Sequence, residues 1–258
     1  MFSTLGIAAS GLATAGVQLN ADAVNLANLQ TPGFGRQSVA VTAGAEQLVR
    51  PGTTVLAGQV LVPDLGWPQG SVVAGTAPLF GDSIRPTGVP TNLAIAGAGF
   101  FAVQAPDGGV AYTRAGDFAP DAAGQLVLPD GSRLLPPVTV PPGATVAISS
   151  QGVVTATLPS GTTRTLGRIT LVQFPNPQGL EAIGGNLYRP GPDAGAPQPG
   201  RPGTGGLGTL QAGALNQSGV SLTATLGNLL EAQETYLLTA RVLGVAGSLE
   251  RLTAGLRA

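Results

Sequence analysis

The first 34 residues constrain this chain most, because they predict a helix that cannot be stable alone. Leucine recurs at every seventh position, and small or apolar residues follow three positions later. These positions are Leu5, Ala8, Leu12, Ala15, Leu19, Leu26 and Leu29. An apolar seam this narrow requires a partner helix. Ser3 can cap the start of the helix, and the run Thr31-Pro32-Gly33 predicts its end, because proline disfavours helical geometry in the residue before it.

Residues 220–256 repeat this pattern at the other end of the chain. Their apolar positions are again seven apart and then shift by one residue: Leu222, Leu229, Tyr236 and Leu243, followed by Val242, Leu249 and Leu256. A helix of this length would extend for about 50 Å, which exceeds what a small globular domain needs. Matching seams at both ends predict a coiled-coil-like base. An intramolecular helical hairpin in a monomer is the alternative interpretation.

The charge content indicates that much of the surface is covered by neighbours. Of the 258 residues, 43% are hydrophobic, which is ample for a core, but only 10% are charged. A soluble monomer usually has about a quarter charged residues. The formal net charge is −1, and every basic residue is an arginine without clustering. This distribution excludes the basic patch that a nucleic-acid partner would need.

The missing residue types argue against an enzyme. The chain has no Cys and no His, so thiol catalysis, the commonest general base and the commonest zinc ligands are absent. We predict no catalytic residues, no cofactor and no metal site. The opening residues carry no charge and do not form a leader, and no uninterrupted apolar run reaches membrane-spanning length. We therefore expect export without a cleaved signal peptide and no direct membrane insertion.

The middle of the chain predicts strands. Residues 35–90 alternate short apolar pieces with Gly and Pro, which indicates an extended or β connecting region. Residues 91–175 contain regular β-type runs separated by the turn dipeptides Asp107-Gly108, Asp130-Gly131 and Ser160-Gly161, and predict an all-β outer domain. Residues 176–215 read as a return arm. Its stretch between 186 and 208 is rich in Gly and Pro and is expected to be a linker or an arm that orders only against something else.

The predicted fold class is therefore α+β, mainly β. Residues 1–34 and 216–258 form an inner helical domain, residues 91–175 form the outer domain, and Gly/Pro-rich segments connect them.

Several motifs resemble those of the bacterial flagellar rod and hook family. In chain order they are Asn25-Leu26-Ala27-Asn28, Thr31-Pro32-Gly33-Phe34, the runs 92–103, 112–118 and 124–127, and Gln233 with Tyr236. The run 174–188 is similar to subunits of the distal rod in particular. The resemblance covers nearly the whole chain.

The resemblance implies a structural subunit of the distal rod of the flagellar basal body. Such subunits form a hollow helical homopolymer that transmits torque from the motor to the hook and conducts exported flagellar proteins. Its implied partners are other copies of the chain, the proximal rod and hook proteins along the axis, the L- and P-ring proteins around the rod, and the flagellar export apparatus. The implied location is the periplasmic rod, reaching the outer membrane.

The predicted assembly interface combines the two seams with the motif residues. It comprises Leu5, Leu12, Leu19, Asn25, Leu26, Asn28, Thr31, Pro32, Gly33, Phe34, Leu222, Leu229, Gln233, Tyr236, Leu243 and Leu249. Asn25 and Asn28 are expected to bind backbone groups where the helix meets its partners, and Phe34 is expected to anchor the departing chain. A proximal rod or hook subunit, and a monomeric β-domain binding module on a helical stalk, remain the alternatives.

Overall fold

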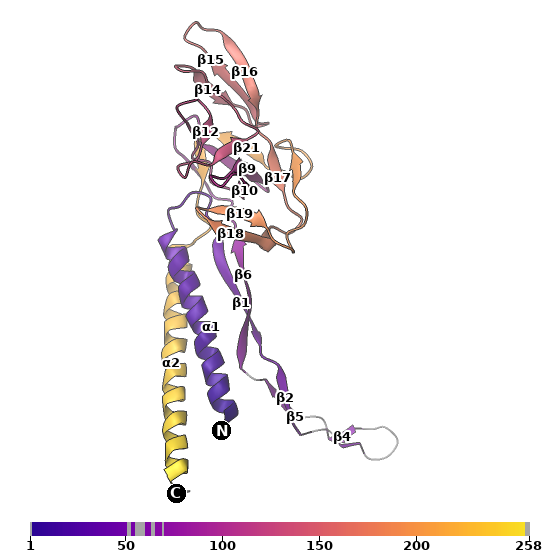
Figure 1. Cartoon of the computed structure of the whole chain (residues 1–258), viewed down its shortest axis with the longest axis vertical. Coiled ribbons are helices and arrows are strands. Elements are labelled where there is room, and N and C mark those ends of the chain that lie inside the picture. The colour runs from indigo at the N-terminus through magenta and orange to yellow at the C-terminus, as the bar shows by residue number, and fades with distance from the viewer. Residues whose placement is uncertain (1, 51–52, 55–59, 63–64, 69, 256–258) are drawn as a thin grey trace. The chain divides into compact units, whose positions relative to one another are not determined.

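The computed structural model of the chain is mainly β, with one long helix at each end (Figure 1). It describes residues 2–50, 53–54, 60–62, 65–68 and 70–255, and it describes side chains within 5–45, 70–249 and 251–252. Two compact units form. The helical unit comprises Met1–Val24, Ser38–Thr76 and Leu222–Ala258, and the β unit comprises Asn25–Gln37 and Ala77–Ser221. The predicted α+β class with a predominance of strands is confirmed.

The two terminal helices of the helical unit run antiparallel, side by side (Figure 1). They are α1 (Phe2–Ala27) and α2 (Leu222–Gly255). Gly11 of α1 lies beside Thr239 of α2, where a Cβ added to Gly11 would make an ordinary van der Waals contact with the Thr239 Cγ2 atom at 3.5 Å. Ala15 is 1% exposed. Small residues of α1 are therefore among those that pack within the helical unit.

A long β-hairpin completes the helical unit. Its strands are β1 (Arg36–Ala43), β2 (Glu46–Arg50), β3 (Thr53–Thr54), β4 (Val60–Val62), β5 (Leu65–Pro68) and β6 (Ser71–Leu79). They pair in nested order, β1 with β6, β2 with β5 and β3 with β4. The hydroxyls of Thr14 and Ser71 lie 2.8 Å apart, and the Ser71 N–H donates to the Ser10 hydroxyl at 3.2 Å. These bonds hold α1 against the hairpin.

The β unit is built around a nine-stranded antiparallel sheet. Seven of its strands follow the order β11-β12-β13-β9-β10-β19-β18, while β17 pairs with β9 and β20 with β17. Separate small sheets join β14, β15 and β16, β21 with β8, and β22 with β7.

The strands of the β unit are short and closely spaced in the sequence. They are β7 (Ile84–Pro86), β8 (Leu93–Ala96), β9 (Phe100–Gln104), β10 (Val110–Thr113), β11 (Ala119–Pro120), β12 (Leu126–Val127), β13 (Arg133–Leu135), β14 (Thr145–Ile148), β15 (Val153–Thr157), β16 (Thr163–Arg168), β17 (Leu171–Gln173), β18 (Leu180–Gly184), β19 (Leu187–Pro190), β20 (Gln198–Gly200), β21 (Thr209–Ala212) and β22 (Ala214–Asn216), with a short 3-10 turn at Pro177–Gly179.

The three predicted turn dipeptides each join neighbouring antiparallel strands, as expected. They connect β9 to β10, β12 to β13 and β15 to β16. Gly108, Gly131 and Gly161 have φ values of 85°, 88° and 81°, in the left-handed region that favours glycine. The turn dipeptides in the sequence therefore predicted these three reversals of the chain correctly.

One difference from the sequence prediction stands out, and one predicted segment finds its packing partner. Helix α1 ends at Ala27, before the predicted stop, because the Asn28 and Leu29 N–H groups bond three residues back and tighten the chain into turns. The predicted return arm is packed within the β unit. Its strand β20 pairs with β17, and its Ala194 is 0% exposed. Backbone hydrogen bonds to the sheet order this segment, which its own side chains could not order alone.

The core of the β unit collects the inward-facing residues of these strands. Phe101 is 0% exposed and packs edge-on against Phe118, with ring centroids 5.3 Å apart. Leu93, Ile95, Val103 and Leu171 are buried in the same cluster. The apolar runs that the sequence placed between residues 91 and 175 supply most of this cluster, and a second buried cluster forms around Phe100, Phe174 and Tyr188.

We predict that Phe101→Ala destabilises the chain by about 3–5 kcal/mol, because it removes a fully buried ring and leaves a cavity. Denaturant unfolding monitored by circular dichroism measures this. Val110→Ala is the control, because Val110 lies on the neighbouring strand with 49% of its surface exposed. The control should change the unfolding free energy by less than about 0.5 kcal/mol. Equal effects of the two substitutions would contradict this account of the core.

Candidate assembly interface

The motif residues at the end of α1 form hydrogen bonds within their own chain. Asn25 is 1% exposed, and its side chain pairs with both backbone groups of Gln37. The Gln37 N–H donates to Asn25 Oδ1 at 2.7 Å, and Asn25 Nδ2 donates to the Gln37 carbonyl at 2.9 Å. The Thr31 hydroxyl donates to Asn28 Oδ1 at 3.0 Å. Asn25 therefore holds the end of the helix beside the start of β1, as a backbone strand would.

The Pro32-Gly33-Phe34 run is held from two sides within the β unit. The Gly33 N–H donates to the Asn216 carbonyl at 2.8 Å, and Asn186 Nδ2 donates to the Pro32 carbonyl, also at 2.8 Å. Phe34 is 8% exposed, and its carbonyl accepts from the Gly219 N–H. Gly33 has a φ of 65° and sits against the backbone of Arg114, which leaves no space for a side chain. The run is therefore a buried junction.

Asn216 is a key residue that sequence reasoning did not single out. Its side chain pairs with both backbone groups of Ile95, accepting from the N–H at 2.8 Å and donating to the carbonyl at 2.9 Å. Asn216 is 1% exposed. It joins the segment before α2 to strand β8. No local pattern marks this asparagine, because its partner lies 121 residues away in the sequence.

Asn186 and Tyr188 form the matching pair on β19. The Tyr188 hydroxyl accepts from the Gly35 N–H at 3.2 Å and donates to Asn186 Oδ1 at 3.3 Å. Asn186 is the one non-glycine residue with positive φ in the described part of the chain, at 60°. The sequence signal for this conformation was an asparagine directly after the Gly184-Gly185 pair, because asparagine tolerates positive φ better than other non-glycine residues. Its strained backbone places the side chain on the junction.

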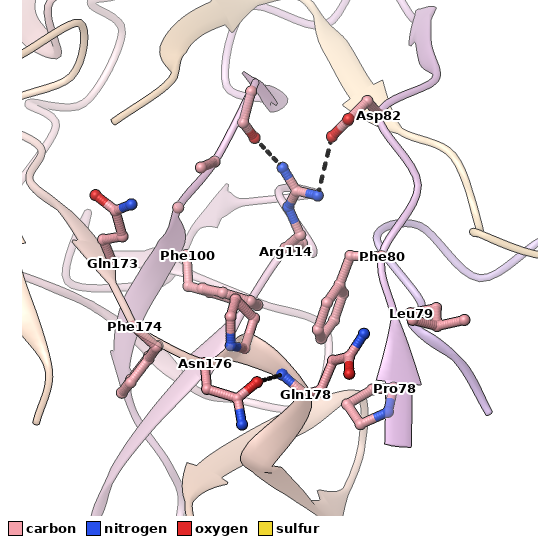
Figure 2. A pocket seen from close by; sticks show the side chains of 14 residues that line it. Pro78, Leu79, Phe80, Asp82, Phe100, Arg114, Gln173, Phe174, Asn176 and Gln178 are labelled. Atoms are coloured by element: carbon pink, nitrogen blue, oxygen red, sulfur yellow. Dashed lines mark hydrogen bonds and ion pairs between the residues drawn. The ribbon is translucent and has the colours of Figure 1, made fainter. Parts of the chain in front are cut away.

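A buried arginine and three phenylalanines form a second junction in the β unit (Figure 2). The Arg114 guanidinium donates from Nη1 to the Gly81 carbonyl and to Asp82 Oδ1, both at 3.3 Å, and from Nη2 to the Gly97 carbonyl. Burial lowers the pKa of Arg114, while the Asp82 carboxylate opposes that shift. Arg114 therefore ties β10 to the loops after β6 and β8.

The rings beside Arg114 pack edge-on. The Phe80 ring centroid lies 4.9 Å from that of Phe100 and 5.1 Å from that of Tyr188. Phe80, Phe100 and Phe174 border an open cavity of about 420 Å³ (Figure 2). The cavity contains one charge pair and no arrangement of nucleophile and base. Within the described residues, no group of three His, Cys, Asp or Glu side chains could hold a metal ion.

The predicted seam residues on the helices are distributed differently from the motif residues. On α1, Leu5, Leu12, Leu19 and Leu26 are half-buried. On α2, Leu229 and Leu243 are half-buried, whereas Leu222, Tyr236 and Leu249 are 46%, 39% and 51% exposed and Gln233 is exposed. The structure thus separates the predicted interface into a buried junction in the β unit and an open apolar surface on α2.

The apolar surface of α2 is unusually extensive. Ten large apolar residues along it are at least 39% exposed: Leu222, Leu226, Leu230, Tyr236, Leu237, Leu238, Val242, Val245, Leu249 and Leu252. A helix that is apolar all round is normally buried on all sides. In the parts of the chain that the structure describes, no helix is apolar enough over a sufficient length to cross a bilayer.

Comparison with known proteins decides the family. The flagellar hook protein FlgE/F/G D1 domain matches residues 94–156. The flagellar basal-body rod protein FlgG of Caulobacter vibrioides is 35% identical over 260 residues, covering 98% of each chain. FlgG of Buchnera aphidicola from Acyrthosiphon pisum is 32% identical over 249 residues, covering 93% of this chain and 94% of its own.

This chain belongs to the FlgG family of flagellar basal-body rod proteins. The recognition made from the motifs is thereby confirmed, and the family is one of structural proteins rather than enzymes. FlgF of Escherichia coli, another basal-body rod protein, is 32% identical over 178 residues, which cover 64% of this chain. The FlgG relatives therefore match the terminal segments and the β unit together, and the FlgF relative matches a smaller part.

We predict that Asn216→Ala lowers the unfolding free energy by about 2–4 kcal/mol, because two buried backbone groups of Ile95 lose their partners. Denaturant unfolding of the full chain measures the loss. Gln211→Ala is the matched control, since Gln211 is exposed on the adjacent strand β21. If Asn216→Ala proved as mild as the control, the side chain would not be holding the junction together.

We also predict that stability falls as pH rises above about 10. Burial raises the pKa of Tyr188, against the lowering effect of the hydrogen bond from Gly35, and burial raises the pKa of Tyr112. The unfolded chain then releases these protons at lower pH than the folded chain. Because the unfolded state binds fewer protons in this range, the unfolding free energy decreases with rising pH.

Denaturant titrations between about pH 8 and about pH 11 test this prediction cleanly, because the chain has no lysine to titrate in the same range. Tyr188→Phe should make the decline shallower, and replacing Tyr112 as well should reduce it further. At neutral pH the Tyr188→Phe chain should lose about 1–3 kcal/mol, since the Gly35 N–H loses its acceptor. An unchanged alkaline slope in both variants would refute the assignment.

Proposed function

We propose that this chain is a structural subunit of the distal flagellar rod, assembling through its terminal helices into a hollow helical homopolymer. The exposed apolar surface of α2 is the observation that carries the proposal. Ten large apolar residues facing solvent would be costly for a permanent monomer, because each buried Å² of apolar surface is worth about 25 cal/mol. Packing of α2 against other copies removes that surface from water.

The terminal helices form the inner layer of the proposed tube. Residues 1–34 and 216–258 contribute this layer as a coiled-coil-like base, and the antiparallel packing of α1 and α2 within one chain supplies its repeating element (Figure 1). The hairpin within residues 35–90 lies in the chain between the inner layer and the outer β domain, and residues 176–215 pack within the β unit before the chain enters α2. Isolated helices are marginal without tertiary contacts, so the ends of an unassembled subunit open readily.

To transmit torque, the segments that connect the inner layer with the β unit must be held at fixed points of that unit. The junction supports this role, because Asn25, Asn186, Asn216 and Tyr188 pin the segments through which the chain enters and leaves the β unit. Each segment is held by side chains bonding to the backbone. The β unit then transmits force into four connections instead of one flexible tether.

The proposed location and partners follow from the rod assignment. The subunit stacks on the proximal rod at one end and meets the hook at the other, with the L- and P-ring proteins around it. It reaches the growing tip through the flagellar export apparatus, and the finished tube conducts later exported proteins. The matches to relatives named FlgG cover nearly the whole chain, whereas the match to FlgF covers 64% of it, which supports the assignment made from the run 174–188.

We predict that removing residues 220–258 abolishes polymerisation, because the truncated chain lacks the exposed apolar surface of α2. Sedimentation of the purified full chain and the truncated chain over a range of concentrations, with and without preformed seeds, measures this. The full chain should pellet above a critical concentration and the truncated chain should stay in solution. In cells lacking the chain, electron micrographs of basal bodies should show the rod without its distal part.

Two results would overturn the proposal. A full-length chain that stays monomeric at every concentration, with seeds present, would instead support a monomeric binding module. Basal bodies with an intact distal rod in cells that lack the chain would move it to another part of the flagellum. This test requires that the β unit of the truncated chain stays folded. Cooperative unfolding of its tyrosine-containing core measures this independently of polymerisation.

A further inference from the structure

A second cavity of the β unit lies beside the buried junction at Pro32. It has a volume of about 320 Å³ and shares no lining residue with the cavity beside Arg114. Three segments line it: the turn after α1, strand β7, and the residues that lead from β22 towards α2. The cavity therefore lies where the chain enters and leaves the β unit.

The charged side chain of this lining is Arg85, and none of the described residues around the cavity is Asp or Glu. The ion pairs within the described part of the chain join Arg114 to Asp82 and Arg189 to Asp107. Asp82, the nearest carboxylate to Arg85 along the chain, is therefore already engaged. Arginine stays charged at all ordinary pH values. A permanent positive charge among neutral polar groups favours an anion and disfavours a metal cation.

Ser218 gives a second, independent reason to expect a ligand. It lines the cavity, and its hydroxyl is buried without a hydrogen-bond partner among the described residues. A buried donor without a partner costs free energy. Serine can redirect its hydroxyl by rotating one side-chain torsion between staggered positions. An acceptor oxygen bound in the cavity would supply the partner that the described residues do not.

The other polar side chains of the lining determine which ligand fits. Asn216 pairs with the backbone of Ile95, so its amide is already used. Gln30 and Gln217 are exposed, and each can donate from its amide. The cavity thus offers a guanidinium, a hydroxyl and two amides as donors, a set that suits a carboxylate or phosphate group.

The size of the cavity is consistent with such a ligand. A water molecule takes up about 30 Å³ in the liquid, so about 320 Å³ accommodates a phosphate or carboxylate group together with several waters. An apolar ligand fits less well, because it would take these donors out of water without offering them an acceptor.

We propose that Arg85 and Ser218 bind an oxyanion, a phosphate or carboxylate group, where the chain enters and leaves the β unit. The bound group accepts hydrogen bonds from β7 and from the segment that leads into α2, and thereby cross-links them. It comes either from a free anion in solution or from an Asp or Glu side chain of a second copy. Binding of a free anion is independent of the proposed homopolymer, whereas binding of a second copy's carboxylate rests on it.

Denaturant unfolding of the monomeric full-length chain in phosphate tests the free-anion source. At about 50 mM phosphate the unfolding equilibrium constant should fall about tenfold relative to chloride at equal ionic strength, as for a Kd of about 5 mM. Arg85→Gln should reduce this response below about twofold. Arg164→Gln is the matched control, since Arg164 is an exposed arginine on β16, and it should keep the full response. General stabilisation by phosphate acts on all three chains and cancels in the comparison.

Ser218→Ala distinguishes a ligand-binding hydroxyl from a structural one. Without phosphate its unfolding equilibrium constant should stay within about twofold of the unmodified chain, because the hydroxyl has no partner to lose. Its affinity for phosphate should fall about three- to tenfold, as expected for the loss of one neutral hydrogen bond. A Ser218→Ala chain that is destabilised without phosphate and yet keeps the full phosphate affinity would contradict the proposed site.

Sedimentation of the polymer tests the second-copy source. In that case phosphate has no specific effect on the monomer. Arg85→Gln should then raise the critical concentration at least about tenfold and Ser218→Ala at least about threefold, because each removes a donor to the neighbour's carboxylate. Arg164→Gln should leave it within about twofold. Circular dichroism of the three variants should match that of the unmodified monomer.

Failure of the site and failure of the proposed function give different results. An unmodified chain that never polymerises overturns the homopolymer, and the phosphate response alone then decides whether the site exists. When the unmodified chain polymerises, the site is overturned if Arg85→Gln changes neither the phosphate response nor the critical concentration. It is equally overturned if Arg164→Gln has the same effects as Arg85→Gln, since the loss would then follow from net charge alone.

Discussion

The rest of this structure depends on side-chain amides that bond to backbone groups far away in the sequence. Asn25 with Gln37 and Asn216 with Ile95 each reproduce the two hydrogen bonds of a strand pair between segments that do not pair as strands. Backbone groups buried at a crossing of segments must be paired, because an unpaired group costs free energy. Asparagine meets this need with one donor and one acceptor.

The β unit buries its apolar core within one chain, whereas α2 leaves apolar surface uncovered. This division suits a subunit that folds first and assembles afterwards. The core around Phe101 and the aromatic cluster around Phe80 are formed within one chain. The exposed leucines and valines of α2 gain contacts only when other helices arrive. Stability and assembly therefore rest on different residues.

Much of the fold could be predicted from local patterns. The terminal helices followed from seven-residue spacing, and the hairpins of the β unit followed from Asp-Gly and Ser-Gly turns. The end of α1 and the packing of residues 186–208 could not, because both depend on distant partners. The same limit applies to the candidate interface. The motif predicted that Asn25 and Phe34 matter, and the structure showed that they bind within their own chain.

The sequence by itself determined that both ends are helices with apolar seams, that the middle is β, and that catalysis has no obvious residues to use. Spacing along the chain is enough for these conclusions, because helices and strands bury side chains with different periods. Only the tertiary structure decided which seam is already occupied. Thr239 lies against Gly11 of α1, whereas many larger apolar side chains of α2 remain exposed. Periodicity identifies a face of a helix, but only packing shows which partner covers it.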